Sequence, residues 1–501
     1  MAETDRTFVE AARRDKLKEL VERGIAPFAY RFARSATARR ALDAYVGDDD
    51  PATYALAGRL VALRPHGKTT FAHLEDASGK IQLYFKSDEL GEAYPLLELL
   101  DLGDHVGVEG RLMKTRTGEI TLRVARYVLL AKALRPLPLG KEDASGVKHG
   151  ELSDPELRYR QRYVDLAVHP EVRDVFRLRA RFVQGIRAFL DARGYLEVET
   201  PVLQPLYGGA TATPFTTHWE ALDATFYLRI ADELYLKRCL VGGLEKVYEI
   251  GHDFRNEGLS RFHNPEFTMA EWYEAYADYH DMAALTEELL ATLVQQLFGT
   301  RVLERHGATL SFEPPFARQD YYGLVREHAG VDLAAAGDAE LRAVLKRHNV
   351  PAGEIDRLSG GKLVDEVFKT TVEPKLIQPT FVFDYPVALS PLAKPKRGDP
   401  TRVERWELFV QHRELANCFS ELNDPDEQRR RFEQQGRLRA AGDTEAQQLD
   451  EDFIRALEYG MPPAGGVGLG VDRLTMILAD QTNIRDVILF PMLRPTPATP
   501  A

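Results

Sequence analysis

The stretch EIGHDFRNEGLSRFHNPEFTMAEWYEAYAD, from Glu249 to Asp278, decides the fold class of this 501-residue chain. An alternating run reaches Phe254, a segment rich in turn-forming residues follows, and PEFTMAEWYEAY then favours a second strand because of its aromatic residues. We therefore expect two strands joined by a polar loop. A period of two places four side chains on one face of the second strand: Phe267, Met269, Glu271 and Tyr273.

Charged residues crowd the loop between these two strands, namely Arg255, Glu257, Arg261 and His263. Arginine offers a planar fork of donors to phosphate oxygens, so this loop suits a site that holds a phosphate chain. A polar hairpin turn with exposed charges is the alternative that the loop alone leaves open.

The composition, 44% hydrophobic and 28% charged, is that of an ordinary soluble protein, and the length predicts two to four domains at about 100–200 residues each. The chain has no run of about 18 apolar residues and no apolar segment near its start, so we expect a cytoplasmic protein without a membrane partner. The net charge of −12 argues against a protein that coats nucleic acid, although local basic patches could still hold an RNA. Cys239 and Cys418 lack metal-ligand spacing and are expected to be reduced thiols.

Three segments resemble the three motifs of class II aminoacyl-tRNA synthetases, in the form found in the bacterial lysyl-tRNA synthetases. FRNEG with HNPEFTMAEWYEAYADY resembles motif 2, FLDARGYLEVETPVL (189–203) resembles motif 1, and GVGLGVDRLTMIL (466–478) resembles motif 3. Three motifs in the right order over about 300 residues are a far more specific signal than any one of them. The resemblance implies an α+β protein with a C-terminal antiparallel sheet flanked by helices.

Residues 54–130 alternate with period two between turns that contain Gly and Asp, which predicts a small closed β-barrel. This segment resembles the OB-fold anticodon-binding domain of the lysyl, aspartyl and asparaginyl enzymes. A purely structural all-β domain is the alternative, since OB-folds serve many functions. The resemblance implies that three residues hold the central uridine of the anticodon: Phe71, Gln82 and Glu119.

The expected domain organisation starts with a helical extension over 1–53, including a helix over 7–23, and the OB-fold domain over 54–132. A linker rich in Pro and Gly over 133–165 leads to the catalytic domain over 166–494, with a helical insertion over about 331–373. The tail over 495–501 is expected to be disordered.

In motif 1, an amphipathic helix over 176–194 precedes YLEVETPVL, a predicted strand that Pro201 stops. An ordinary surface helix would have the same pattern. The resemblance implies instead that this helix and strand form much of a two-fold homodimer interface.

The resemblance also implies ATP-dependent activation of L-lysine to lysyl-adenylate, followed by transfer of lysine to the 3′ end of tRNA(Lys). The implied ATP-binding residues are Arg255, Glu257, His263, Phe267 and Arg473, of which Arg255 and Arg473 are catalytic. The implied lysine-binding residues are Gly209, Glu233, Glu271, Tyr273, Asn417 and Glu421.

Glu407 and Glu414 are seven residues apart and so have opposite strand parity. A tight turn around Gln411 and His412 would make their strands antiparallel neighbours and bring the two carboxylates together. Two converging carboxylates suit Mg²⁺, which also takes phosphate oxygens, and the resemblance implies this role. Without the resemblance, two partly exposed surface glutamates would explain the pattern.

The chain departs from the lysyl pattern at several positions. Thr213 stands where Arg or Lys is usual, Asp232 replaces a proline, Gln411 and His412 replace Gly-Gly, and Ala464 replaces a threonine.

Three alternative functions remain. An aspartyl or asparaginyl enzyme would need a cationic or amide-binding pocket, and an enzyme that lysylates a protein such as elongation factor P would lack the barrel. A catalytically inactive nucleic-acid-binding or regulatory paralogue is disfavoured by the joint presence of Arg255, Arg473, Glu407 and Glu414.

Overall fold

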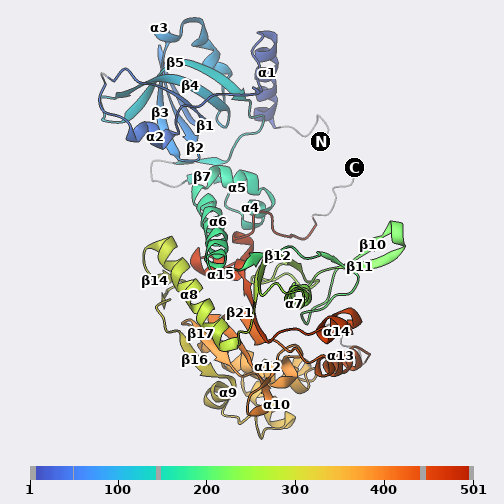
Figure 1. Cartoon of the computed structure of the whole chain (residues 1–501). Coiled ribbons are helices and arrows are strands. Elements are labelled where there is room, and N and C mark those ends of the chain that lie inside the picture. Colours follow the sequence, from blue (N-terminus) through green and yellow to red (C-terminus); the bar gives the residue numbers. More distant parts are fainter. Residues whose placement is uncertain (1–6, 49, 143–147, 441–446, 496–501) are drawn as a thin grey trace. The chain divides into compact units, whose positions relative to one another are not determined.

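The computed structural model describes residues 7–48, 50–142, 148–440 and 447–495, and the chain forms two compact units, Met1–Val168 and His169–Ala501 (Figure 1). Apart from Pro495, the tail that we expected to be disordered lies outside the described residues.

The first unit begins with helix α1 (Phe8–Glu22). The Thr7 hydroxyl accepts a hydrogen bond from the Glu10 amide and caps the start of the helix. After the last turn, Gly24 adopts a left-handed conformation (φ 73°), which ends the helix where the sequence predicts. A shorter helix, α2 (Ala38–Asp43), follows.

Five strands of this unit close into a barrel in the order β1-β2-β3-β5-β4 (Figure 1). The strands are β1 (Thr53–His66), β2 (Thr69–Asp76), β3 (Gly79–Lys86), β4 (His105–Lys114) and β5 (Ile120–Ala131). Alternate residues such as Leu74, Leu83 and Leu122 fill the interior. The short helix α3 (Ser87–Leu90) and two 3₁₀ turns connect β3 to β4. The predicted OB-fold barrel is therefore confirmed.

The segment expected as a linker carries secondary structure of its own. Strands β6 (Leu139–Glu142) and β7 (Lys148–Glu151) pair antiparallel, and the helices α4 (Pro155–Arg160) and α5 (Arg162–Val168) follow.

The second unit is built on an eight-stranded sheet in the order β16-β17-β20-β21-β22-β13-β12-β8. The two edge pairs, β16 with β17 and β8 with β12, are parallel, and all other neighbours are antiparallel. The expected antiparallel sheet is thus confirmed for its interior. The strands are β8 (Leu196–Glu197), β12 (Lys246–Phe254), β13 (Glu266–Ala275), β16 (Ala317–Asp320), β17 (Thr380–Phe383), β20 (Arg405–Val410), β21 (Arg413–Ser420) and β22 (Ala464–Gly470).

One face of this sheet is apolar and covered by helices. Trp272, Trp406 and Val467 point to this face, where they meet α6 (Pro170–Asp191), α8 (Tyr279–Phe298) and α15 (Val471–Leu478) in the main core (Figure 1). Because side chains alternate along a strand, the residues between them point to the opposite face.

Asp472 connects the three motif segments. Its carboxylate accepts a hydrogen bond from the Thr268 amide (2.8 Å) and pairs with Arg179 of α6, which also donates to the Thr268 hydroxyl (2.8 Å). Motifs 1, 2 and 3 therefore meet at one carboxylate.

The strand predicted in motif 1 is shorter than expected. β8 has two residues, and the chain resumes pairing after Pro201 as β9 (Leu203–Gln204), in a separate sheet with β10 (Thr216–Trp219) and β11 (Ala224–Leu228). Proline has no amide hydrogen for a strand ladder, so it separates the two pieces.

The remaining elements surround the sheet. Helix α7 (Glu233–Val241) contacts β12 and β13. The predicted helical insertion contains α10 (Asp338–Arg347), α11 (Ala352–Ile355) and α12 (Gly360–Thr371), which pack with α9 (Tyr321–Ala329) around a second core. The other elements are the strand pairs β14 (Val302–Arg305) with β15 (Ala308–Ser311) and β18 (Pro395–Lys396) with β19 (Asp399–Val403), and the helices α13 (Pro425–Ala440) and α14 (Glu451–Glu458).

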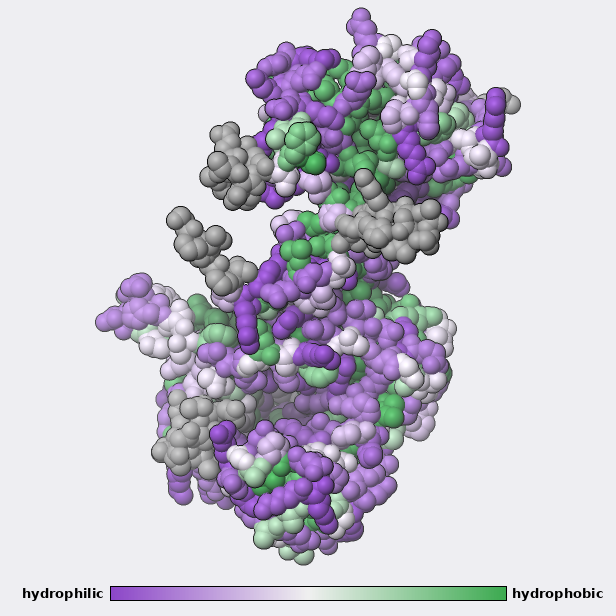
Figure 2. Space-filling view, turned by 180° about the vertical axis from the view of Figure 1, so that it is seen from behind, coloured by the Kyte–Doolittle hydropathy of each residue, from purple (hydrophilic) through white to green (hydrophobic). Residues whose placement is uncertain are grey.

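The face drawn in Figure 2 is dominated by hydrophilic residues. Within the described ranges, no helix combines the length and the hydropathy that a membrane crossing requires. Cys239 and Cys418 are free thiols, as expected.

Candidate active site

The open face of the large sheet carries a row of polar residues across five neighbouring strands. In register, Glu407 on β20 faces Asn417 on β21, which faces Gly468 on β22, then Glu271 on β13 and Glu249 on β12. Residues that pair directly across antiparallel strands point to the same side. Four polar side chains therefore project from one line of the sheet into the same space.

Strand β22 keeps this space open because Gly466, Gly468 and Gly470, which alternate along the strand, all face it. A Cβ atom at Gly466 would lie 2.2 Å from Glu421 Oε1 and 2.2 Å from Tyr273 Cε1. At Gly468, it would lie 3.1 Å from the Met269 methyl group. The side chains of Tyr273 and Glu421 therefore lie directly over the glycines of β22, and we call the group of buried side chains above these glycines the pocket.

Three buried charged side chains meet at one end of the pocket. Lys237 Nζ lies 2.5 Å from Glu233 Oε1 and 2.5 Å from Glu421 Oε2. Glu233 is the first residue of α7, and Lys237 follows one turn later, so the helical spacing brings this pair together. Glu421 directly follows β21, where its amide donates to the Ala464 carbonyl (2.8 Å).

Glu271 and Tyr273 lie two residues apart on β13, and the Tyr273 hydroxyl donates to Glu271 Oε2 over 3.3 Å. Both side chains are buried in the same pocket.

Burial raises the pKa of three carboxyl groups in this pocket. It raises the pKa of Glu421 to about 8 against the opposing charge of Lys237, and it raises the pKa values of Glu233 and Glu271 above the ordinary value for glutamate. Among the described residues, Lys237 is the cation that forms ion pairs with these groups, and it pairs with Glu233 and Glu421 at once, so the three buried carboxyl groups have fewer ion-paired cations than acids. Such a pocket favours a cationic ligand.

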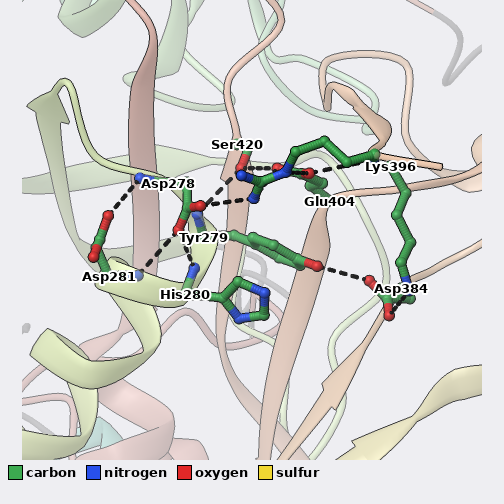
Figure 3. A network of polar contacts seen from close by, with 9 residues as sticks. Asp278, Tyr279, His280, Asp281, Asp384, Lys396, Glu404 and Ser420 are labelled. Atoms are coloured by element: carbon green, nitrogen blue, oxygen red, sulfur yellow. Dashed lines mark hydrogen bonds and ion pairs between the residues drawn. The ribbon is translucent and has the colours of Figure 1, made fainter.

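A network behind the sheet fixes the end of β21 just before Glu421 (Figure 3). The Ser420 hydroxyl donates to Glu404 Oε2 (2.6 Å) and accepts from the Tyr279 amide (3.1 Å). Arg397 joins Glu404 to Asp278, the N-cap residue of α8 (2.7 Å to Asp278). A second branch runs from the Tyr279 hydroxyl to Asp384 (3.0 Å), which also pairs with Lys396.

The other end of the pocket is lined by arginine and aromatic side chains. Arg255, just after β12, lies over the Phe267 ring with 5.1 Å between the guanidinium carbon and the ring centroid. Arg473 on α15 donates to the Glu414 carbonyl (3.0 Å), and its other terminal nitrogen lies 3.3 Å from His263 Nε2. Burial and the charge of Arg473 lower the pKa of His263, so its imidazole is neutral at physiological pH.

A tight turn brings Glu407 and Glu414 to the same face of the sheet. Gln411 and His412 form a two-residue turn with φ values of 48° and 64°, the backbone shape that tight hairpins require. The turn pairs Glu414 with Phe409, which lies on the same side of β20 as Glu407. A bulge beyond this pair, between Leu408 and Phe409, then places Asn417 opposite Glu407.

Glu407 is well buried. Its carboxylate accepts from the Tyr385 hydroxyl (2.8 Å) and pairs with Arg405. Burial raises the pKa of Glu407 to about 7, and the nearby charge of Glu414 adds to this rise. Glu414 in turn pairs with Arg473 (3.3 Å), so each of the two carboxylates has an arginine partner.

Gly209 and Glu257 complete the set of predicted residues in this unit. Gly209 has φ 86°, and a Cβ there would lie 3.2 Å from Glu233 Cβ, so its backbone lies against the start of α7. Glu257 is exposed in the loop after β12. The Asn256 amide in this loop donates to the Thr213 carbonyl (2.8 Å), a backbone contact that the departure at Thr213 leaves intact.

The three residues predicted on the barrel lie close together. Gln82 Nε2 donates to Glu119 Oε2 (2.7 Å), and Gln82 pairs in register with His73, on the same side of β2 as Phe71. The Phe71 ring lies 5.0 Å from that of Tyr84, centroid to centroid. This partly exposed patch offers aromatic rings beside an amide and a carboxylate.

The sequence analysis missed Lys237, Arg405 and Tyr385. Two of them carry a local signal: Lys237 follows Glu233 by four residues on a helix, and Arg405 precedes Glu407 by two residues on a strand. Tyr385 reaches Glu407 from a different part of the chain, and no local pattern indicates this contact.

Comparisons with known proteins agree with this geometry. The profile of the family described as tRNA synthetases class II (D, K and N) matches residues 154–494, and that of the OB-fold nucleic acid binding domain matches residues 54–130. The lysine–tRNA ligase of Carboxydothermus hydrogenoformans is 52% identical over 96% of this chain and 97% of the relative. That of Pelotomaculum thermopropionicum is 51% identical over 98% of this chain and 96% of the relative. That of Moorella thermoacetica is 52% identical over 97% of this chain and 97% of the relative.

The glycine floor gives a first prediction. Gly466→Ala should lower the free energy of unfolding by about 1–3 kcal/mol, because its Cβ would overlap the Glu421 and Tyr273 side chains. Gly353→Ala is the matched control, since a Cβ there meets open space. Urea unfolding of both variants measures the difference, and equal stabilities would show that Gly466 is not packed as described.

Proposed function

As a member of the class II tRNA synthetases (D, K and N), this chain activates lysine and charges tRNA with it, and we propose that its acidic pocket selects the lysine. The observation that carries this proposal is the surplus of buried carboxylates over cations around Glu233, Glu271 and Glu421. A buried ammonium group without a partner is costly, and so is a buried carboxylate, so each stabilises the other when lysine binds.

In this proposal, Glu421 and Tyr273 take the ε-ammonium group of lysine, and Glu233 with the Gly209 carbonyl takes the α-ammonium group. Asn417 helps to hold the lysine carboxylate, and Glu271 belongs to the pocket wall. Neither oxygen of Glu421 accepts a well-aligned hydrogen bond from a described residue, so both retain lone pairs for the substrate. Lys237 ties Glu233 to Glu421 and keeps them at a fixed separation.

We propose that ATP binds at the arginine-lined end. Phe267 would stack on adenine, and Arg473 would cover its other face while reaching the γ-phosphate. Arg255 would bind the α-phosphate, His263 the bent triphosphate and Glu257 the adenine edge. The neutral state of His263 lets its Nε2 accept a hydrogen bond from Arg473, which can only donate.

Activation then needs no nucleophile from the protein. A lysine carboxylate oxygen attacks the α-phosphorus, the bond to the bridging oxygen breaks, and pyrophosphate leaves with the electron pair. In the second step, a hydroxyl of the tRNA terminal ribose attacks the carbonyl carbon of the adenylate and AMP leaves. Arg255 and Arg473 act by positioning and by neutralising charge.

We include Mg²⁺ in this proposal. Glu407 and Glu414 fit it because Mg²⁺ prefers one or two carboxylates together with phosphate oxygens, and because both side chains project from the same face of the sheet. The ion would neutralise phosphate charge when it is bound with ATP.

We also propose a homodimer and a cytoplasmic location. Exposed apolar side chains gather around motif 1, at Leu196, Val202, Leu203 and Leu206, as an interface between subunits requires. The free thiols Cys239 and Cys418 suit a reducing compartment.

The pocket disfavours the aspartyl and asparaginyl alternatives. An aspartate side chain would bring a further negative charge next to Glu421 and Glu271, both of which are buried. Burial already disfavours the charged forms of these groups, so another carboxylate would be repelled.

Exchange of labelled pyrophosphate into ATP tests the selection of lysine. We expect lysine alone among the twenty standard amino acids to support exchange in the absence of tRNA, because the other side chains cannot neutralise the pocket in the same geometry. Exchange driven by aspartate or asparagine would overturn the assignment.

The patch formed by Phe71, Gln82 and Glu119 is proposed to bind the central uridine of the anticodon. Phe71→Ala removes a stacking surface worth about 1–3 kcal/mol per base, so charging of tRNA should fall about 5- to 150-fold. Pyrophosphate exchange should remain normal, because the pocket for activation lies in the other unit.

Phe8→Ala is the matched control, since Phe8 is 89% exposed and lies outside the barrel strands. Charging and exchange are measured on the same preparations. A charging rate that is equal in the Phe71 and Phe8 variants would exclude the anticodon role of Phe71.

A further inference from the structure

Asp232 and Asp253 form a buried pair of carboxyl groups beside the lysine pocket. Asp232 is the N-cap residue of α7, next to Glu233, and Asp253 is the penultimate residue of β12. Both side chains are essentially inaccessible to solvent. The pair brings together two positions 21 residues apart in the sequence.

No described residue donates a well-aligned hydrogen bond to any of their four oxygens. Arg229 Nε lies 2.9 Å from Asp232 Oδ1 and 3.4 Å from Asp253 Oδ1, but it donates its hydrogen bond to the His252 carbonyl (2.9 Å). Buried carboxylates are normally hydrogen-bonded. A proton on one of the two carboxyl groups would supply the missing donor.

The local charges point to the same conclusion. Arg229 also contacts Glu249 Oε1 (2.5 Å), so one guanidinium group faces three buried carboxylates. Glu271 and Glu233 add negative charge from the pocket side, and Arg255 adds positive charge near Asp253. Burial raises the pKa of Asp232 to about 11 and that of Asp253 above its ordinary value. The charge of Asp253 raises the pKa of Asp232 further, whereas a hydrogen bond from Asp232 lowers that of Asp253, which is the pattern of a proton held on Asp232 and shared with Asp253.

We propose that Asp232 and Asp253 share one proton in the free enzyme and release it when the ammonium groups of lysine enter the adjacent pocket. This inference rests on the proposed function, because it takes lysine as the ligand of that pocket. The arriving positive charge favours the fully ionised pair. Release of the proton makes the surroundings of the pocket more negative when the doubly charged lysine binds. The pair exists in this chain because Asp232 stands where a proline is usual.

The direction of the pH dependence follows from this exchange. Bound enzyme holds fewer protons than free enzyme, so lysine affinity rises with pH wherever the pH lies between the two pKa values of the pair. The side chain of lysine keeps its charge only below its own pKa of about 10.4, so the rise in affinity is read below that pH. The pKa of Glu421 is also raised, so Glu421 can release a proton when lysine binds as well. Proton release by the wild-type enzyme alone therefore does not identify which carboxyl group loses the proton.

Titration calorimetry with L-lysine in two buffers of different ionisation enthalpy, at about pH 8, measures the number of protons released. Asp232→Asn replaces the shared proton by a permanent amide donor. We expect this variant to release fewer protons than wild type, by up to about one per site, and to show a weaker rise of lysine affinity with pH. The KM for lysine should increase while kcat changes little.

Asp223→Asn is the matched control, since Asp223 is exposed in the turn between β10 and β11, and it should match wild type. Asp253→Asn gives the same readout from the other member of the pair if the first variant does not fold. Equal proton release by wild type and by a folded variant would overturn the proposal, and so would wild type that binds lysine without any release. Absence of lysine binding to wild type would instead refute the proposed function.

Discussion

The burial of more carboxylates than cations on the open face of one sheet is the constraint on which the rest of the site depends. Glu233 and Glu421 share Lys237 as their ion-pair partner, Glu271 lies beside them, and burial keeps the pKa values of all three high. Isolated buried charges of this kind destabilise a fold unless a partner compensates them. The pocket therefore carries an electrostatic cost in the free protein that binding of a dication removes, which links folding directly to substrate selection.

The sheet makes such burial possible by keeping two faces with opposite roles. Trp272 and Trp406 anchor the covered face, while the alternate residues of the same strands form the polar row. The glycines of β22 leave room for the side chains of β13 and β21 to converge over it. Asp472 joins β13 to α6 and α15 through Thr268 and Arg179.

Sequence reasoning captured the features that depend on local periodicity. The alternation of β13 placed Glu271 and Tyr273 on one face, and the barrel followed from the same period of two. The turn at Gln411 and His412, which brings Glu414 to the face of Glu407, was also predicted. The bulge that places Asn417 opposite Glu407 was not predictable, because a bulge adds one residue to the ladder without a distinctive sequence pattern. The pairing of Asp232 with Asp253 depends on how α7 docks on β12, which only the tertiary structure defines.

The most direct test of the charge account compares L-lysine with L-norleucine, which keeps the aliphatic chain and the α-amino group but lacks the ε-ammonium group. The measurement is kcat/KM for amino-acid-dependent pyrophosphate exchange. The account predicts a loss of about 10⁴-fold with norleucine, because a site built around a polar substrate group leaves its own buried groups unpaired when that group is missing. Exchange with norleucine within about tenfold of that with lysine would contradict it, since a tenfold ratio corresponds to only about 1.4 kcal/mol.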